Sequence, residues 1–160
     1  MNFSSMFEEM RLNGLKLANR FVFPPIKTAL GTPAGHVTDG HLRYYRQMAA
    51  SGPALIILEP VAVTSNGKEH PKQLCVHLPE SGSELKKIVH VIHEANRMAC
   101  LHLNHAGAAA NPKASGSKPK APWNITCPTT GQDAEPLNAA EIQEIVDGYR
   151  TAAEKAVSAG

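Results

Sequence analysis

The alternation of apolar and polar residues is clearest over residues 98–104, which it predicts to be a strand. Strand side chains point alternately to two faces, so the polar side chains share one face and the leucines the other. Such a strand is equally typical of a sheet edge and of a barrel strand entering an active site. A loop rich in Gly, Pro and Lys follows over residues 105–137, and loops this long are usually functional or disordered. This loop favours the active-site interpretation. The polar face comprises Cys100, His102 and Asn104.

Two further segments are predicted strands. Residues 20–24 end at a proline pair, and proline cannot donate to a strand ladder. Residues 54–58 are apolar at every position, which is typical of a strand covered on both faces in a parallel sheet. Glu59-Pro60 is expected to end that strand. Ahead of the first strand, Asn13-Gly14 between apolar residues predicts a hairpin.

Helical periodicity predicts three helices. The first begins at Thr38 or Asp39 and ends at residues 51–53, Ser-Gly-Pro. The second begins at a capping box of Ser81 and Glu84, and the third begins at Asn138 with Glu141. The apolar faces are Leu42, Tyr45, Met48 and Ala49 in the first helix, Leu85, Ile88, Val89 and Ile92 in the second, and Ile142, Ile145, Val146, Tyr149, Ala153, Ala156 and Val157 in the third. We expect Tyr149 to be a core residue.

The predicted order is strand, helix, strand, helix, strand, helix, with long connections after the strands and short ones after the helices. That asymmetry is typical of an α/β TIM barrel, (β/α)₈, in which the loops after the strands form the site. The chain would supply an N-terminal hairpin and roughly the first three βα units. A doubly wound sheet is the alternative, but it requires a glycine-rich turn after the first strand, where Pro24-Pro25-Ile26-Lys27 stands.

Composition narrows the class of protein. The 160 residues with 42% hydrophobic content suffice for one domain with a core. A net charge of +2 does not indicate a nucleic-acid partner, and the longest apolar run, residues 54–58, is too short to span a membrane. Three cysteines without a CxxC pair indicate neither a zinc ribbon nor an iron–sulfur cluster. Their odd number and the lack of a signal peptide favour the cytoplasm. The cysteines are Cys75, Cys100 and Cys127.

The histidines and lysines allow sharper readings that we do not favour. His90 and His93 flank the apolar face of the second helix, and His102 and His105 could share a metal only if the strand breaks between them. We therefore predict no metal site. The lysines of residues 105–137 could attract an anionic substrate, but they are more typical of a solvated loop. Trp123 remains free to stack on a ligand.

Four segments carry a resemblance to a known family. They are Asn-Arg-Phe-Val-Phe-Pro-Pro at 19–25, Glu-Pro-Val-Ala-Val at 59–63, Leu-His-Leu-Asn-His-Ala-Gly at 101–107, and Ala121-Pro122. Together they resemble the Old Yellow Enzyme (NADH:flavin oxidoreductase) family, in the family's order and along nearly the whole chain. The resemblance implies an FMN-dependent barrel that takes hydride from NAD(P)H and passes it to an activated alkene or related small-molecule acceptor.

The resemblance also implies site residues. The flavin would lie against the turn Pro24, Pro25, Ile26 and Lys27 and against Pro60, and His102 would reach its pyrimidine edge. His105 and Trp123 are substrate-side candidates. The family usually has Gln at position 102, Thr or Cys at position 27, and Arg at position 108, where Ala stands. An ammonium at Lys27 would favour the reduced, anionic flavin, or it could instead point to solvent or phosphate.

The resemblance covers only the first three βα units, so no catalytic residue is assigned. The family's proton donor and substrate clamp would lie beyond Gly160. Three parallel strands cannot close a barrel and leave a bare hydrogen-bonding edge. We expect residues 1–160 to be the N-terminal portion of one FMN-binding barrel domain, completed by another chain or by a missing C-terminal half. The alternative is a non-catalytic half-barrel that acts as an interaction or scaffold subunit.

Overall fold

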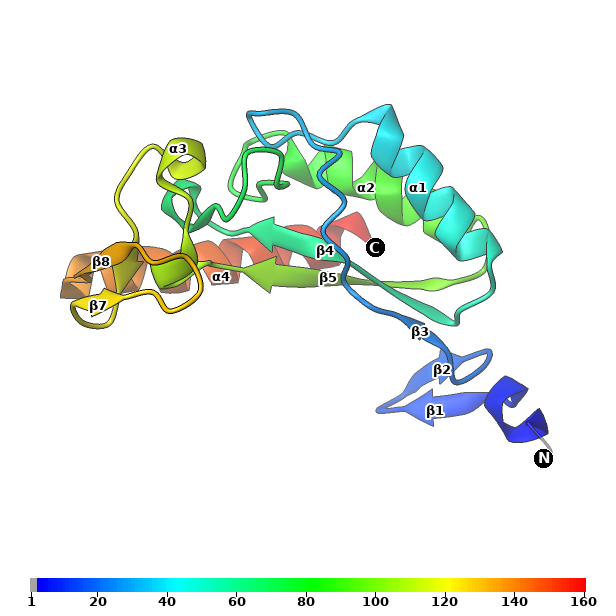
Figure 1. Ribbon diagram of the computed structural model, residues 1–160. Helices are drawn as coiled ribbons and strands as arrows, with labels where there is room; N and C mark the ends of the chain where they lie inside the picture. Colours follow the sequence, from blue (N-terminus) through cyan, green and yellow to red (C-terminus); the bar gives the residue numbers. More distant parts are fainter. Residues whose placement is uncertain (1–2) are drawn as a thin grey trace.

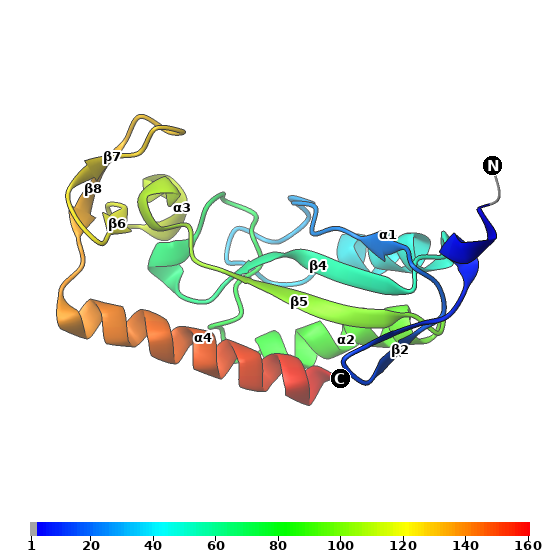
Figure 2. The same cartoon turned by 90° about the horizontal axis from the view of Figure 1, so that it is seen from below.

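The computed structural model describes residues 3–160 and is built on an open parallel sheet. Its strands lie in the order β3 (Val22–Phe23), β4 (Leu55–Ala62) and β5 (Met98–Asn104), all parallel. The helices α1 (Asp39–Ala50), α2 (Ser81–His93) and α4 (Ala139–Ala159) gather on one side of the sheet (Figures 1 and 2). The predicted succession of three βα units is confirmed.

The predicted end of the second strand is wrong, because β4 continues through Glu59-Pro60 to Ala62. A register shift between Ile57 and Pro60 inserts an irregularity into the pairing with β5. Such bulges accommodate an extra residue and a proline without ending the strand. The third strand coincides with the predicted residues 98–104.

The predicted hairpin precedes the sheet. β1 (Met10–Leu12) pairs antiparallel with β2 (Leu15–Leu17), after a short helical turn, η1 (Ser4–Phe7). Asn13 and Gly14 have φ values of 49° and 88°, the left-handed conformation that a two-residue hairpin turn requires. The Asn-Gly signal therefore predicted this turn correctly.

The helix starts follow the sequence signals at α1 and α4 but not at α2. Thr38 caps α1, and Asn138 forms the expected reciprocal box with Glu141 at α4. At α2 the cap position is Glu80, so the predicted capping box is wrong. The Ser81 hydroxyl donates instead to the carbonyls of Val76 and Leu78, each at 2.7 Å. Glu84 reaches away from the helix to another loop, described below.

The core fills the space between the sheet and the helices. Ile56 and Leu58 of β4 and Ile88 and Ile92 of α2 are at most 1% exposed. The apolar stripe of α4 is less buried. Tyr149 is 36% exposed, so the prediction that it is a core residue is wrong. The helix α4 buries Ala152 and Ala159 instead. Its large exposed apolar residues are Ile142, Val146, Tyr149 and Val157.

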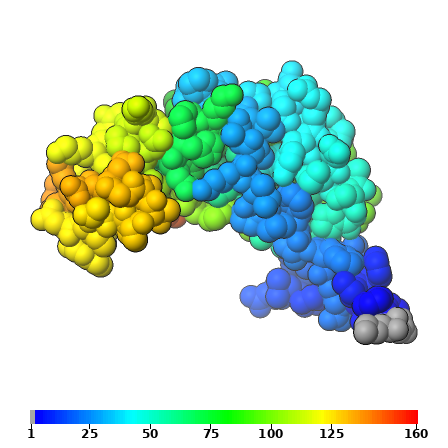
Figure 3. Space-filling view, in the orientation of Figure 1, coloured from blue at the N-terminus to red at the C-terminus, as the bar shows by residue number. Residues whose placement is uncertain are grey.

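Residues 105–137 are more ordered than the loop we expected. They contain η3 (Gly107–Ala109), α3 (Pro112–Ser115) and a small sheet of β6 (Lys120–Ala121), β8 (Asp133–Pro136) and β7 (Ile125–Thr126), in that spatial order. Figure 3 shows this segment, in yellow and orange, at the opposite end of the molecule from the blue N-terminal hairpin. Within the described range, no helix is both long and apolar enough to cross a membrane.

Candidate flavin site

The face of β5 that carries the polar residues lies opposite the helices. Leu101 and Leu103 pack against the helical core, while Cys100 on the other face is exposed. The two remaining polar side chains of that face are half-buried and incompletely paired. His102 Nδ1 and Asn104 Nδ2 are buried atoms that find no hydrogen-bond partner among residues 3–160. Buried polar atoms in native proteins are almost always paired, so these two atoms are candidates for contact with a bound polar group.

The irregularity in β4 brings Pro60 beside His102. Cys100 is the register partner of Ile57, but the shift that follows makes Pro60 the partner of His102 and Ala62 the partner of Asn104. Pro60 has no N–H to offer a ligand, and its carbonyl accepts a hydrogen bond from Gln73 Nε2 at 3.2 Å. The ring of Pro60 and the imidazole of His102 therefore come from register partners on neighbouring strands.

The turn Pro24–Lys27 leaves the end of β3 at the same edge of the sheet. Parallel strands place their carboxyl ends together, which is where barrel enzymes build their sites. Thr28 anchors the turn by donating to Glu59 Oε1 at 2.6 Å, and Lys27 forms an ion pair with Glu69. Ile26 remains 48% exposed. The structure therefore brings the turn, Pro60 and His102 to one end of the sheet.

A buried polar cluster that sequence reasoning missed lies beneath this turn. Glu59 is 1% and His41 0% exposed, and His41 Nε2 lies 3.2 Å from Glu59 Oε1. His41 Nδ1 accepts from the Thr38 N–H at 3.1 Å, which places the proton of a neutral imidazole on Nε2. Nε2 itself makes no hydrogen bond within residues 3–160, so its approach to Glu59 is an electrostatic contact. The Glu59 N–H donates to the Tyr45 hydroxyl at 2.8 Å. Burial and the nearby Glu59 raise the pKa of Tyr45, so it stays a neutral phenol.

The signal for this cluster was present in the sequence. Glu59 directly follows the five apolar residues 54–58, and a carboxylate that continues such a run is buried if the strand continues. We missed it because Pro60 predicted the end of the strand. His41 gave no signal, because its burial depends on the approach of β4 to α1.

His105 is held by its own turn. Its Nδ1 accepts from the Gly107 N–H at 3.1 Å, and its Nε2 lies 3.2 Å from Asn66 Oδ1. A Cβ at Gly67 would lie 2.5 Å from the imidazole, so only glycine allows this contact. Desolvation lowers the pKa of His105 and favours the neutral ring. Trp123 lies between β6 and β7 and is 62% exposed.

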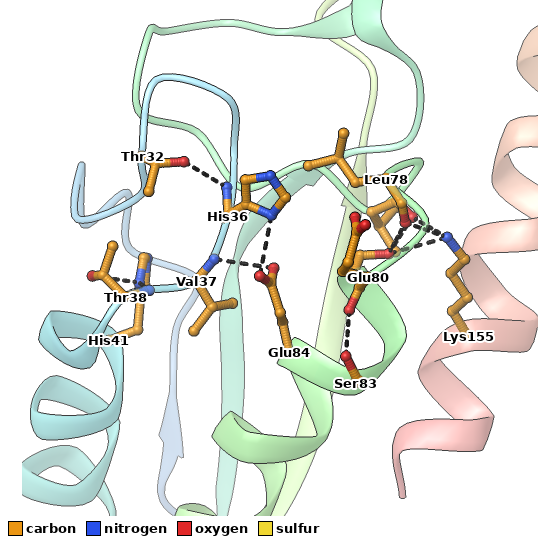
Figure 4. A network of polar contacts seen from close by, with 12 residues as sticks. Thr32, His36, Val37, Thr38, His41, Leu78, Glu80, Ser83, Glu84 and Lys155 are labelled. Atoms are coloured by element: carbon orange, nitrogen blue, oxygen red, sulfur yellow. Dashed lines mark hydrogen bonds and ion pairs between the residues drawn. The ribbon is translucent and has the colours of Figure 1, made fainter.

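Figure 4 shows how α2 and α4 hold the loops that follow β3 and β4. Glu84 accepts from the Val37 N–H at 3.2 Å and pairs with His36 Nδ1 at 3.1 Å. Lys155 donates to the carbonyls of Val76 and Leu78 at 2.9 and 2.7 Å. These contacts hold both loops against the helices. The sequence did not predict this role for Glu84 or for Lys155.

His90, His93 and the lysines of residues 105–137 lie at or near the surface, as expected. His90 and His93 are exposed on α2, and His90 pairs with Glu94 at 3.3 Å. Lys118 and Lys120 both pair with Glu135, at 2.9 and 3.5 Å, so their charge is partly neutralised.

The architecture is that of part of a (β/α)₈ barrel. Its strands are parallel, its helices lie on one side of the sheet, and unpaired polar atoms lie toward the carboxyl end of β5. The chain belongs to the NADH:flavin oxidoreductase / NADH oxidase family, whose model matches residues 5–160. FMN, with NAD(P)H as reductant, is the cofactor of this family. Both the predicted family and the predicted barrel class are confirmed.

Individual relatives agree with this assignment. The chain is 31% identical over 160 residues to an NADH oxidase of Thermoanaerobacter brockii, covering 99% of this chain and 25% of that protein. It is 26% identical over 155 residues to an NADPH dehydrogenase of Clostridium acetobutylicum, covering 97% of this chain and 45% of that one. It therefore spans less than half the length of these relatives.

The chain also matches less than half the length of two similar solved structures. An Old Yellow Enzyme homologue from Zymomonas mobilis superposes with a TM-score of 0.88 at 25% identity, over 98% of this chain and 46% of that one. A 2-naphthoyl-CoA reductase superposes with a TM-score of 0.94 over 99% of this chain and 26% of that one. Its identity is 17%, so it supports the fold alone.

Proposed function

We propose that residues 1–160 are the N-terminal portion of a single FMN-binding barrel domain. In this proposal the whole protein transfers hydride from NAD(P)H, through the flavin, to an activated alkene or related acceptor. The observation that carries the proposal is the unpaired Nδ1 of His102 beside Pro60, at the end of the sheet where the turn 24–27 also lies. The flavin supplies the redox chemistry, and the protein supplies position and electrostatics.

Each residue has a proposed role. The backbone of Pro24, Pro25, Ile26 and Lys27 packs along the flavin, and Pro60 contributes an apolar contact. His102 Nδ1 makes one hydrogen bond to the pyrimidine edge, as donor or acceptor according to its tautomer. His105 shapes the substrate side indirectly, by fixing the turn at Asn66, and Trp123 contributes to the rim of the substrate region.

We also propose that a further polypeptide segment completes the barrel. The sheet ends at β5 in the described residues, and the exposed apolar residues of α4 lie on the helix that packs beside it. A groove of about 240 Å³ between α2, α4 and β5 is lined by apolar residues such as Leu85, Val89 and Val157. A C-terminal half of the same protein, or a partner chain, would cover this surface. Free cysteines support a cytoplasmic location.

The test is FMN binding by the purified chain. We expect shifted visible absorption bands that persist through dialysis, and we expect the His102→Ala variant to bind at least tenfold more weakly, because it loses a buried hydrogen bond. His93→Ala, at an exposed histidine of α2, is the matched control and should bind as the wild type does.

A chain that leaves FMN free is then joined to the C-terminal part of the Zymomonas mobilis homologue. Recovery of bound flavin in that chimera would support the portion-of-a-barrel proposal. A folded chimera that binds no flavin would contradict it and favour a non-catalytic half-barrel.

A further inference from the structure

The loop after β4 contains a buried amide that joins two parts of the candidate site. Gln73 is 1% exposed, and both ends of its amide are used. Its Nε2 donates to the Pro60 carbonyl at 3.2 Å, and its Oε1 accepts from the Glu69 N–H at 2.6 Å. Burying a primary amide is unfavourable unless its donor and acceptor are paired. Gln73 therefore fixes Glu69 with respect to Pro60.

Glu69 extends this connection to the first turn. Its carboxylate forms an ion pair with Lys27, whose side chain is 51% exposed, while that of Glu69 is 28% exposed. An ion pair so accessible to solvent adds little to folding stability. What the pair does determine is where the Lys27 ammonium lies.

A broad, open groove surrounds this pair. It has a volume of about 550 Å³ and is lined by Lys27, Ala29, Glu69, His70, Pro71 and Lys72. Ala29 has a φ of 55°, a left-handed conformation that costs a non-glycine residue energy and often accompanies functional loops. Gly31 allows the loop to approach closely, since a Cβ there would lie 2.5 Å from the Lys72 carbonyl oxygen.

We propose that Glu69 and Gln73 are positioning residues that link the turn 24–27 to Pro60 of β4 and hold the charge of Lys27. This inference rests on the proposed flavin site. Gln73 ties Glu69 to Pro60, and Glu69 ties Lys27 to Gln73. A flavin bound against the turn 24–27 and Pro60 would then experience the ammonium of Lys27 and the carboxylate of Glu69 together, not an isolated lysine.

The expected electrostatic effect has a definite sign. Reduction of the flavin takes two electrons and one proton as hydride from NAD(P)H, which leaves as NAD(P)⁺, so the reduced, anionic flavin carries one more negative charge. A nearby cation favours that state and a nearby anion disfavours it. Lys27 and Glu69 must therefore act in opposite directions on the flavin's reduction potential.

The experiment measures the midpoint potential of FMN bound to the full chain, by equilibration with a reference dye. Lys27→Met should lower the potential and Glu69→Gln should raise it. Each should change the ratio of oxidised to reduced flavin on the order of tenfold at a fixed potential. The double variant should return close to the wild type. Lys72→Met, a cation of the same groove outside the connection, is the matched control and should change the ratio less than about twofold.

Shifts of the same sign in the two single variants, or no shift in either, would overturn the inference. A purely structural role would reduce stability in both variants without opposite effects on the potential. The result is distinct from failure of the flavin proposal, because FMN retention is recorded in the same samples.

A second readout does not require flavin. Acetic anhydride modifies accessible lysines, and mass spectrometry reports the rate at each one. Glu69→Gln and Gln73→Leu should both speed the modification of Lys27 several-fold, because the carboxylate no longer shields the ammonium, while Lys72 should react at an unchanged rate. Equal reactivity of Lys27 in the wild type and both variants would show that the connection does not exist.

Discussion

Helices α2 and α4 look alike in sequence and differ in what they bury. Both begin near polar residues and carry an apolar stripe at helical spacing. In α2 the stripe is buried, with Ile88 and Ile92 at 0% exposure, whereas Val146 and Val157 of α4 are 54% and 82% exposed. Periodicity identifies which face of a helix is apolar, but the neighbouring elements decide whether that face is covered.

The largest effect on stability should come from replacing one isoleucine of each helix by alanine. Ile88→Ala removes a fully buried side chain, so it should lower the free energy of unfolding by about 2–5 kcal/mol. Ile142→Ala, at a residue that is 49% exposed, should change it by no more than about 0.5 kcal/mol. Urea unfolding of both variants measures the difference.

This comparison can be sharpened with the barrel-completing segment present. Ile142→Ala should then become destabilising if that segment covers α4. Equal losses for the two variants in the isolated chain would show that the α4 stripe is already buried.

The next largest difference in stability should separate the two carboxylates that contact the turn 24–27 and Thr28, Glu59 and Glu69. Glu59→Ala leaves His41 and Thr28 without their buried partner and should cost about 3 kcal/mol. Glu69→Ala, at the half-solvated ion pair, should cost no more than about 1 kcal/mol. Thermal and urea unfolding measure both. If Glu69→Ala is as destabilising as Glu59→Ala, then the exposed ion pair stabilises the fold as much as the buried cluster does, which would contradict this expectation.

A smaller effect is a pH dependence of the folding stability that arises from His105. Desolvation holds its pKa below the ordinary value of 6.5, so the unfolded chain binds its proton more readily than the folded chain. The stability contributed by the neutral ring is present above about pH 6.5 and is lost as the pH falls below it. The urea midpoint should therefore decrease from pH 7.5 to pH 5.5.

The variant His105→Gln should weaken that dependence. His70 and His77 also have pKa values lowered by desolvation, so part of the slope should remain. The exposed His93 supplies the control, since His93→Gln should leave the slope as it is in the wild type. An unchanged slope in His105→Gln would contradict the assignment of a neutral, buried ring.

Much of the fold was predictable because it depends on local patterns. The Asn13-Gly14 turn, the run 54–58, the alternation over 98–104 and the α2 stripe each specify one element without reference to distant residues. The continuation of β4 through Pro60 was not predictable, because it depends on a register shift against β5. The small sheet of β6, β7 and β8 was missed since strands of two to four residues carry too few positions for a period to appear.

The site was predictable only in part. The turn 24–27, Pro60 and His102 came from a resemblance to a family, and no local pattern selects them. Gln73 and His41 had no signal at all. Each is an ordinary polar residue in the sequence, and each becomes buried through partners 13 or more residues away. Positioning residues of this kind appear only when the loops are folded against the strands.

The most direct test of the account is where FMN binds to the chain. Amide chemical shifts of the ¹⁵N-labelled protein, recorded during an FMN titration, would locate it. We expect the largest changes at Ile26, Lys27 and residues 102–104, around the sheet end that carries the unpaired His102 atom. Changes concentrated in the apolar groove between α2 and α4, at residues such as Val89 and Val157, would contradict it.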